Sequence, residues 1–127
     1  MIKTSYFAQL KRIKDLGYLP VSISLHEPKF FQGISFKTLA PTKEILKLKD
    51  NPQECTKAFE AYLSTLDAKR VVKELRFIGG GRTVCLLCYE KTGSFGHRHL
   101  VSKWLRENGY EAEEIIFDAF KNQNSLF

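Results

Sequence analysis

The sequence predicts an α/β protein, a single layered domain with a mostly parallel central sheet flanked by helices. Segments with strand character alternate along the chain with segments of helical periodicity, which is the pattern of βαβ units. Residues 83–89 form a nearly continuous apolar run, typical of a central parallel strand covered on both faces. With 127 residues the chain can bury one core and is too short for two domains, so we assign residues 1–127 to one domain.

The first half of the chain is expected to supply two strands, a helix between them, and a loop. Residues 2–6 have strand character, and residues 7–16 follow as a helix that Gly17 ends. Residues 19–25 alternate apolar and serine side chains, which indicates a second strand. Residues 26–41 have no clear period and are rich in aromatic residues, Lys, Gly and Pro. We interpret them as a long loop, which is often functional, although its aromatic residues could simply fill the edge of the core.

The middle of the chain is expected to be helical. After a short helix over residues 42–49, Asn51-Pro52-Gln53-Glu54 has the pattern of a helix start, with Asn as the N-cap. The apolar residues from 55 to 66 then recur on one face, as in a helix that packs on a core. Asp67 is expected to cap a further helix, which stops at the glycines of residues 79–81.

The last elements are expected to be the strand over residues 83–89, a helix, a final strand and a tail. The helix begins near His97 and ends at Gly109. Residues 111–117 have the character of a short strand, and residues 121–127 are expected to be a loose tail. Because the strands alternate with helices, their carboxyl ends should meet at one edge of the sheet.

Composition excludes some classes of protein. No apolar run approaches the roughly 20 residues that a membrane span requires, and the start of the chain lacks the apolar core of a signal peptide. The three cysteines do not form a disulfide framework. We therefore expect a cytoplasmic protein that does not span a membrane.

The net charge of +6 is concentrated in the first part of the chain. Residues 1–50 carry nine Lys and Arg against four Asp and Glu, whereas residues 51–127 carry eleven against ten. A basic first part is compatible with nucleic acid or a phosphorylated ligand as partner, but a charge of this size favours a mildly basic solvated surface.

The stretch from Cys88 to His99 is the one that indicates chemistry. It runs from the end of an apolar strand, through a Gly/Ser loop, into a helix that opens on Gly96-His97-Arg98-His99. The first backbone N–H groups of a helix lack intrahelical partners and lie at the positive end of the dipole, so this position suits an anion. Arg98 could hold a phosphate or carboxylate of a ligand, or it could pair with Glu90.

Ligands of open parallel sheets bind beyond the carboxyl ends of the strands. The ends of the first and second strands should therefore join the helix start in one pocket. The expected ligand-binding residues are Arg98, Gly96, His97, Lys91, Ser5, Tyr6 and Ser24. The candidate catalytic residues are Glu90, His97 and Cys88, although the sequence favours His97 as a hydrogen-bonded histidine of the core and Cys88 as a buried apolar residue.

Neither a metal site nor a bound cofactor is expected. Cys85 and Cys88 have the spacing of metal ligands, but side chains three residues apart on a strand point to opposite faces. No second cysteine pair completes a tetrahedral site, and the chain lacks the common phosphate-loop, dinucleotide-binding and hydrolase motifs.

Several stretches resemble one uncharacterised family. They read TSYFAQLKRI, LPVSISLHEPKFF, LAPTKE and LLCYEKTGSFGHRHLVSKWL, and they cover the chain from about residue 4 to residue 113. They are similar to the family called domain of unknown function 488, whose most specific motif is Leu-Cys-aromatic-Glu-Lys, a spacer, and Cys-His-Arg before an apolar helix. The positions that match this motif are Cys88, Glu90, Lys91, His97 and Arg98.

Gly96 departs from the family motif, because the family usually has cysteine there. This puts in doubt any mechanism that uses that thiol as a nucleophile or metal ligand. The resemblance implies an α/β fold and a shared polar site, and it implies no activity because none is established for the family.

The sequence supports three hypotheses of function. The first is binding of an anionic, phosphate-bearing ligand, a nucleotide or a nucleic-acid component, at the carboxyl edge of the sheet; catalysis on its phosphate or glycosidic bond is left open. The second is a non-catalytic nucleic-acid-binding module, in which the aromatic residues of 28–37 stack on bases and the lysines meet phosphates. The third is a protein-interaction domain that uses an edge strand or the Phe-rich loop. The oligomeric state is not predicted.

Overall fold

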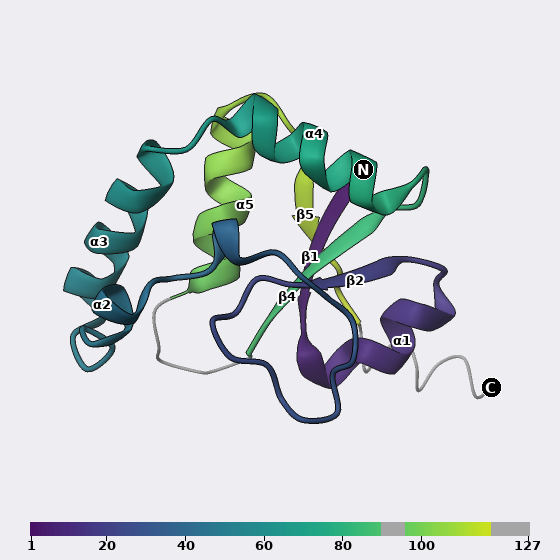
Figure 1. Cartoon of the computed structure of the whole chain (residues 1–127), viewed down its shortest axis with the longest axis horizontal. Helices are drawn as coiled ribbons and strands as arrows, with labels where there is room; N and C mark the ends of the chain where they lie inside the picture. The colour runs from purple at the N-terminus through teal and green to yellow at the C-terminus, as the bar shows by residue number, and fades with distance from the viewer. Residues whose placement is uncertain (90–95, 118–127) are drawn as a thin grey trace.

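A computed structural model describes residues 1–89 and 96–117 and contains a five-stranded, all-parallel sheet (Figure 1). The order of the strands across the sheet is β3-β2-β4-β1-β5, so the most apolar strand lies at the centre. The strands are β1 (Ile2–Tyr6), β2 (Leu19–Ser22), β3 (Ile34–Ser35), β4 (Val84–Cys88) and β5 (Ala112–Glu114). The predicted α/β class with a parallel central sheet is confirmed.

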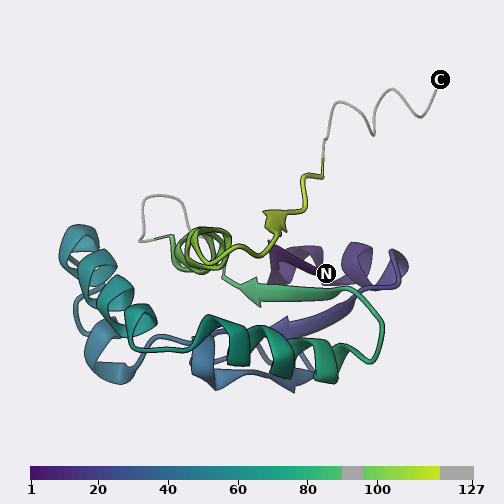
Figure 2. The same ribbon diagram turned by 90° about the horizontal axis from the view of Figure 1, so that it is seen from above.

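Helices cover both faces of the sheet (Figures 1 and 2). The larger apolar cluster joins one face to the helices α2 (Lys43–Leu46), α3 (Pro52–Ser64), α4 (Ala68–Gly79) and α5 (His97–Glu107). The opposite face packs on the short 3-10 helix η1 (Phe7–Gln9) and on α1 (Leu10–Asp15), with Phe7 and Ile13 buried against Cys85 and Leu87 of β4. Both faces of β4 are therefore covered, as its continuous apolar run predicts.

The starts of α3 and α4 are fixed by their own caps. The side chain of Asn51 accepts a hydrogen bond from the Glu54 N–H at 3.2 Å, with Pro52 in the first turn. The Asp67 carboxylate accepts from the N–H groups of Lys69 and Arg70, which satisfies donors that the helix itself leaves unpaired. Both helix starts are as the sequence predicts.

Two predicted elements of the first half are corrected. The strand predicted over residues 19–25 ends at Ser22: the Ile23 N–H still bonds to the Leu87 carbonyl, but the Ser24 N–H turns to the Ser22 hydroxyl, which ends the pairing. The helix predicted over residues 7–16 is divided into η1 and α1.

The region over residues 26–41, predicted as a loop, contains two short elements. Two of its residues form the edge strand β3, and three others form the 3-10 helix η2 (Lys37–Leu39). The buried side chains of Phe31, Phe36 and Leu39 in this region belong to the core. The alternative that its aromatic residues fill the edge of the core therefore accounts for most of them.

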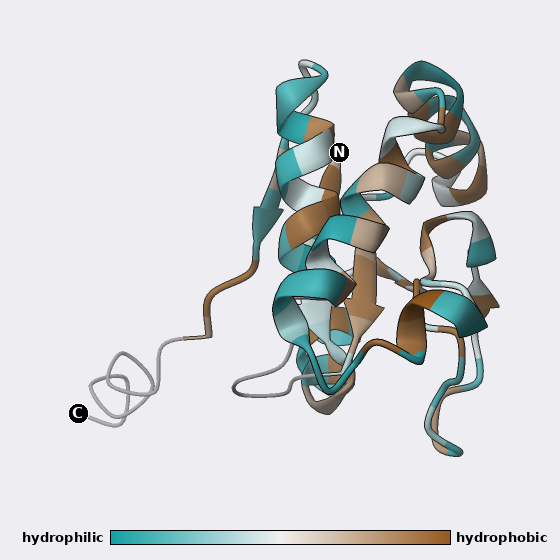
Figure 3. Cartoon of the chain, turned by 90° about the vertical axis from the view of Figure 1, so that its left-hand side faces the viewer, coloured by the Kyte–Doolittle hydropathy of each residue, from teal (hydrophilic) through white to brown (hydrophobic). Residues whose placement is uncertain are grey.

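At the C-terminal end, the strand predicted over residues 111–117 is limited to Ala112–Glu114, and the predicted tail over residues 121–127 lies outside the described residues. The apolar residues 115–117 follow β5 and appear as a brown segment in Figure 3. The same view shows hydrophobic and hydrophilic residues on different sides of the helices. Within the described residues, no helix has both the length and the apolar character needed to cross a bilayer.

Candidate ligand site at the carboxyl edge of the sheet

The first turn of α5 lies at the carboxyl edge of the sheet because α5 follows β4 in the chain. The register pairs Tyr6 at the end of β1 with Cys88 at the end of β4, and it pairs Thr4 with Glu114 of β5. These four side chains lie on the sheet face that α5 covers, since side chains of aligned parallel strands alternate in step. The topology thus collects polar side chains from three strands under one helix start.

Arg98 is the centre of this group. Its Nε donates to the two carboxylate oxygens of Glu114 at 2.9 and 3.1 Å, and its Nη2 donates to Oε2 at 2.9 Å. The Thr4 hydroxyl donates to the same carboxylate at 2.8 Å. Such a two-pronged contact fixes the guanidinium in position and orientation.

The rest of the Arg98 guanidinium is packed against the strand ends. Its carbon lies 5.2 Å from the centre of the Tyr6 ring, and its Nη1 is 3.8 Å from the Cys88 sulfur. Burial opposes the charged form, but the hydrogen bonds to Glu114 outweigh burial and raise the pKa of Arg98 above its ordinary value. Arg98 is therefore a permanently charged group beneath the helix start, with Nη1 turned toward the end of β4.

The start of α5 differs from those of α3 and α4. Its N-cap residue is Gly96, which has no side chain to accept from the first-turn N–H groups, whereas Asn51 and Asp67 accept at the starts of α3 and α4. The helix itself supplies no acceptor for the N–H groups of His97, Arg98 and His99. Farther along α5, the Ser102 hydroxyl donates to the Ala112 carbonyl and ties the helix to β5.

His97 is buried rather than directed to solvent. Its Nε2 lies 2.9 Å from the Leu39 carbonyl, and its ring meets the Phe59 ring edge to face at 4.9 Å. A carbonyl only accepts, so Nε2 carries the hydrogen and donates it. Burial lowers the pKa of His97 to about 4, so the ring is neutral near pH 7. These contacts favour the structural role over proton transfer. His99 is exposed.

Cys85 and Cys88 point to opposite faces of β4 and belong to different apolar clusters, as strand geometry predicts. Burial raises the pKa of Cys85 to about 12. Burial also raises the pKa of Cys88, although Arg98 counteracts part of that increase. Both sulfurs therefore remain thiols near pH 7, which disfavours Cys88 as a nucleophile.

The expected ligand residues do not all share one pocket. Tyr6, Gly96, His97 and Arg98 are grouped on the face that α5 covers. Ser5 points to the opposite face, where it is fully buried and its hydroxyl has no hydrogen-bond partner among the described residues.

Ser24 belongs to a second polar cluster, at the carboxyl ends of β2 and β3. Glu27 is its centre, because one of its oxygens accepts from Ser22 at 2.9 Å, from Ser35 at 3.0 Å and from Lys37. Lys37 also donates to the carbonyls of Ser24 and Leu25 at 2.7 and 2.8 Å. Burial opposes the shift, but these hydrogen bonds lower the pKa of Glu27 below its ordinary value. The hydrogen bonds of this cluster hold together the turn that follows β2.

Two of the predicted site residues, Glu90 and Lys91, lie outside the described residues, so the predicted pair between Arg98 and Glu90 stays a prediction. The carboxylate that holds Arg98 in the structure is Glu114, which sequence reasoning did not select. Strand periodicity places Glu114 on a strand but does not give the register that brings it opposite Thr4. Within the described residues, no group of three His, Cys, Asp or Glu could hold a metal ion.

Comparison with known families identifies the chain. The model of the family described as "Domain of unknown function DUF488" matches residues 27–105, which is more than half of the chain. The chain belongs to this family. The match includes Cys88 and the first turn of α5, whereas Tyr6 and Glu114 lie outside it. Searches of curated proteins and of solved structures found no match.

Proposed function

We propose that this DUF488 protein binds an anionic, phosphate-bearing ligand, a nucleotide or a nucleic-acid component, at the carboxyl edge of its sheet. The observation that carries the proposal is the first turn of α5, which combines a glycine N-cap with the buried Arg98 at that edge. Parallel sheets bind ligands at this edge, and the N–H groups and the positive dipole end of a helix start suit an anion.

The contacts of Arg98 indicate which groups would contact the anion. Glu114 balances much of the Arg98 charge, so the backbone N–H groups of residues 96–98 are the principal donors to the anion. Glu114 holds the Arg98 guanidinium in place near these groups, with Nη1 on the side of the Cys88 sulfur. Tyr6 forms the wall beside the guanidinium, with its hydroxyl accepting from Gln9 at 2.9 Å. Lys91 remains a proposed contributor of positive charge.

Binding is better supported than catalysis. The neutral, buried His97 is occupied by the Leu39 carbonyl, and the Cys88 thiol is protonated near neutral pH. These two candidate catalytic residues therefore have the contacts of residues packed in the core, which do not support a role in catalysis. A catalytic step on the phosphate or glycosidic bond of the ligand would rest on Glu90.

The alternative of a nucleic-acid-binding module is less well supported. Of the aromatic residues in 28–37, Phe31 and Phe36 are buried in the core, and Phe30 alone is well exposed, at 60%. Lys37 is occupied by Glu27 and two carbonyls. Successive bases need several exposed rings to stack on, and this segment offers one.

The proposal can be tested with a single added charge. Gly96→Asp places a carboxylate at the helix start, and its Cβ would lie 3.2 Å from a carbon of the exposed His99 ring, which has room to move. Thermal shift and calorimetry with inorganic phosphate, nucleoside phosphates and sugar phosphates should show binding by the wild type. The Gly96→Asp variant should lose about tenfold or more in affinity, because like charges repel at close range.

The control is Gln53→Glu, which adds the same charge to the first turn of α3. It should bind as the wild type does. If Gly96→Asp binds every phosphate compound as tightly as the wild type does, or if none of these compounds stabilises the wild type, the proposal is wrong.

A further inference from the structure

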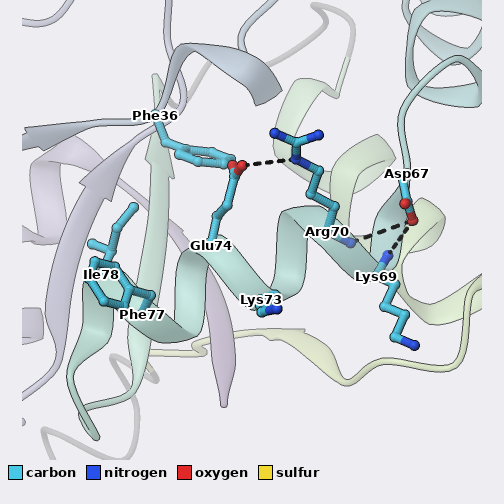
Figure 4. A pocket seen from close by; sticks show the side chains of 8 residues that line it. All are labelled: Phe36, Asp67, Lys69, Arg70, Lys73, Glu74, Phe77 and Ile78. Atoms are coloured by element: carbon cyan, nitrogen blue, oxygen red, sulfur yellow. Dashed lines mark hydrogen bonds and ion pairs between the residues drawn. The ribbon is translucent and has the colours of Figure 1, made fainter.

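A groove runs along the outer side of α4 and shares no residue with the carboxyl-edge site (Figure 4). Its volume is about 680 Å³, which is within the range of binding pockets. It is formed between α4 and the segment that carries Phe36, and its lining residues are Phe36, Asp67, Lys69, Arg70, Lys73, Glu74, Phe77 and Ile78.

One end of the groove is apolar. Phe77 is 88% exposed, which is unusual for so large an apolar side chain, while Ile78 is partly buried and Phe36 is buried. The core of the protein does not need Phe77, because the residues that α4 buries are Ala68, Val71, Val72, Leu75 and Gly79. An exposed ring in a groove that two other apolar side chains also line is the composition of an anchor point for a partner.

The other end of the groove is cationic. Asp67 is occupied with capping α4, and Glu74 pairs with Arg70 at 3.4 Å. The ammonium groups of Lys69 and Lys73 are exposed and have no ion-pair partner among residues 1–89 and 96–117. The groove therefore has an apolar end and two lysines, one turn apart on the same helix, that have no ion-pair partner among the described residues. Its lining carries three positive and two negative side chains and is net positive.

We propose that this groove binds an acidic amphipathic segment of a partner protein. Apolar side chains of that segment would cover Phe77 and Ile78, and its carboxylates would meet Lys69 and Lys73. Residues 67–78 extend over about 18 Å at 1.5 Å per residue, which is enough for a helix of about three turns to lie alongside.

Charge and aromatic content distinguish this occupant from two others. A second copy of the chain would bring another net charge of +6 to a cationic surface, which opposes association. A nucleic acid would find a single well-exposed ring among the lining residues, whereas successive bases need several rings to stack on.

The test uses a fluorescently labelled 14-residue peptide with Leu at positions i, i+3, i+4 and i+7 and Glu at most other positions. Binding to the full chain is measured by fluorescence anisotropy. Phe77→Ala should weaken binding by about tenfold, as expected for an anchor residue. Lys73→Glu should weaken it severalfold, and raised salt should reduce the wild-type affinity.

Matched controls separate the groove from general effects. Ile116→Ala removes an equally exposed apolar side chain elsewhere, and Lys57→Glu reverses an exposed lysine of α3; both should bind the peptide as the wild type does. All four side chains are exposed, so circular dichroism and Tm should be nearly unchanged.

Three results would overturn the proposal. One is equal binding of a peptide in which Lys replaces every Glu. Another is equal loss of affinity in the control variants. The third is tighter binding of a twelve-residue oligothymidine than of the acidic peptide, with the same dependence on Phe77, which would assign the groove to single-stranded nucleic acid.

Discussion

The helices α4 and α5 each carry an Arg that pairs with a Glu, but the two pairs are built differently. In α4, Arg70 and Glu74 are four residues apart, are joined by one contact of 3.4 Å, and have side chains that are 78% and 44% exposed. In α5, Arg98 makes three contacts of 2.9 to 3.1 Å with Glu114 on a different element, and the exposed fractions are 6% and 28%. An Arg–Glu ion pair thus lies on the surface at α4 and is largely buried at α5.

The starts of the two helices are stabilised in different ways. The start of α4 is stabilised locally, by the Asp67 cap, and its ion pair lies in water, where such pairs contribute little. The start of α5 has a glycine cap and is held by distant groups: Glu114 on β5, Thr4 on β1 and the Leu39 carbonyl. Removing a group that holds the start of α5 should therefore cost much more unfolding free energy than removing the cap or the ion pair of α4.

The largest effect is expected for Glu114→Ala. Removing this carboxylate leaves the Arg98 charge buried without its main partner, which typically costs about 3 kcal/mol or more of unfolding free energy. Urea unfolding followed by circular dichroism measures the loss. The control is Glu113→Ala. The Glu113 side chain is exposed and contacts Lys3 only at 3.9 Å, so its removal should cost less than about 0.5 kcal/mol of unfolding free energy. Equal costs for the two variants would show that Arg98 does not depend on Glu114.

A second effect concerns pH and the buried His97. Its folded pKa of about 4 is below the ordinary value of 6.5, so between these pH values the unfolded chain binds a proton there and the folded chain does not. Stability is therefore complete above pH 6.5 and falls as the pH is lowered toward 4, by about 3 kcal/mol from this ring alone. The comparison is urea unfolding of wild type and His97→Gln at pH 7.5 and pH 4.5. The variant should lose much less stability on acidification; parallel losses would place His97 in solvent.

A smaller effect is expected for the cap of α4. Asp67→Ala removes the acceptor for two backbone N–H groups and should cost about 1 kcal/mol. Asp67→Ser keeps an acceptor and should cost a few tenths. Chemical denaturation of both variants gives the difference. A cost for Asp67→Ala as large as that for Glu114→Ala would remove the distinction between a locally and a distantly stabilised helix start.

The same distinction explains how far the sequence could be interpreted. The caps at Asn51 and Asp67 and the two faces of β4 depend on neighbours within a few residues, and all were predicted. The shortening of β2 depends on the Ser22 hydroxyl competing for a backbone N–H, which periodicity does not reveal. The partner of Arg98 depends on the register of β5 against β1, and the separation of Ser5 from Arg98 depends on which face each helix covers. The position of the α5 start at the carboxyl edge of the sheet was predictable, whereas the side-chain pairings there were not.

The smallest effect tests the exposed pair itself. Glu74→Ala should change the unfolding free energy by no more than about 0.5 kcal/mol, because an exposed pair four residues apart on a helix contributes about that amount and is screened by salt. Urea unfolding at low and high salt measures it, with Glu60→Ala on α3, whose contact with Lys103 is 3.6 Å, as a second exposed pair for comparison. Since Glu74 also lines the groove on α4, its removal should strengthen binding of the acidic peptide by releasing Arg70. A loss of stability near that of Glu114→Ala would mean that exposure does not set the strength of these two pairs.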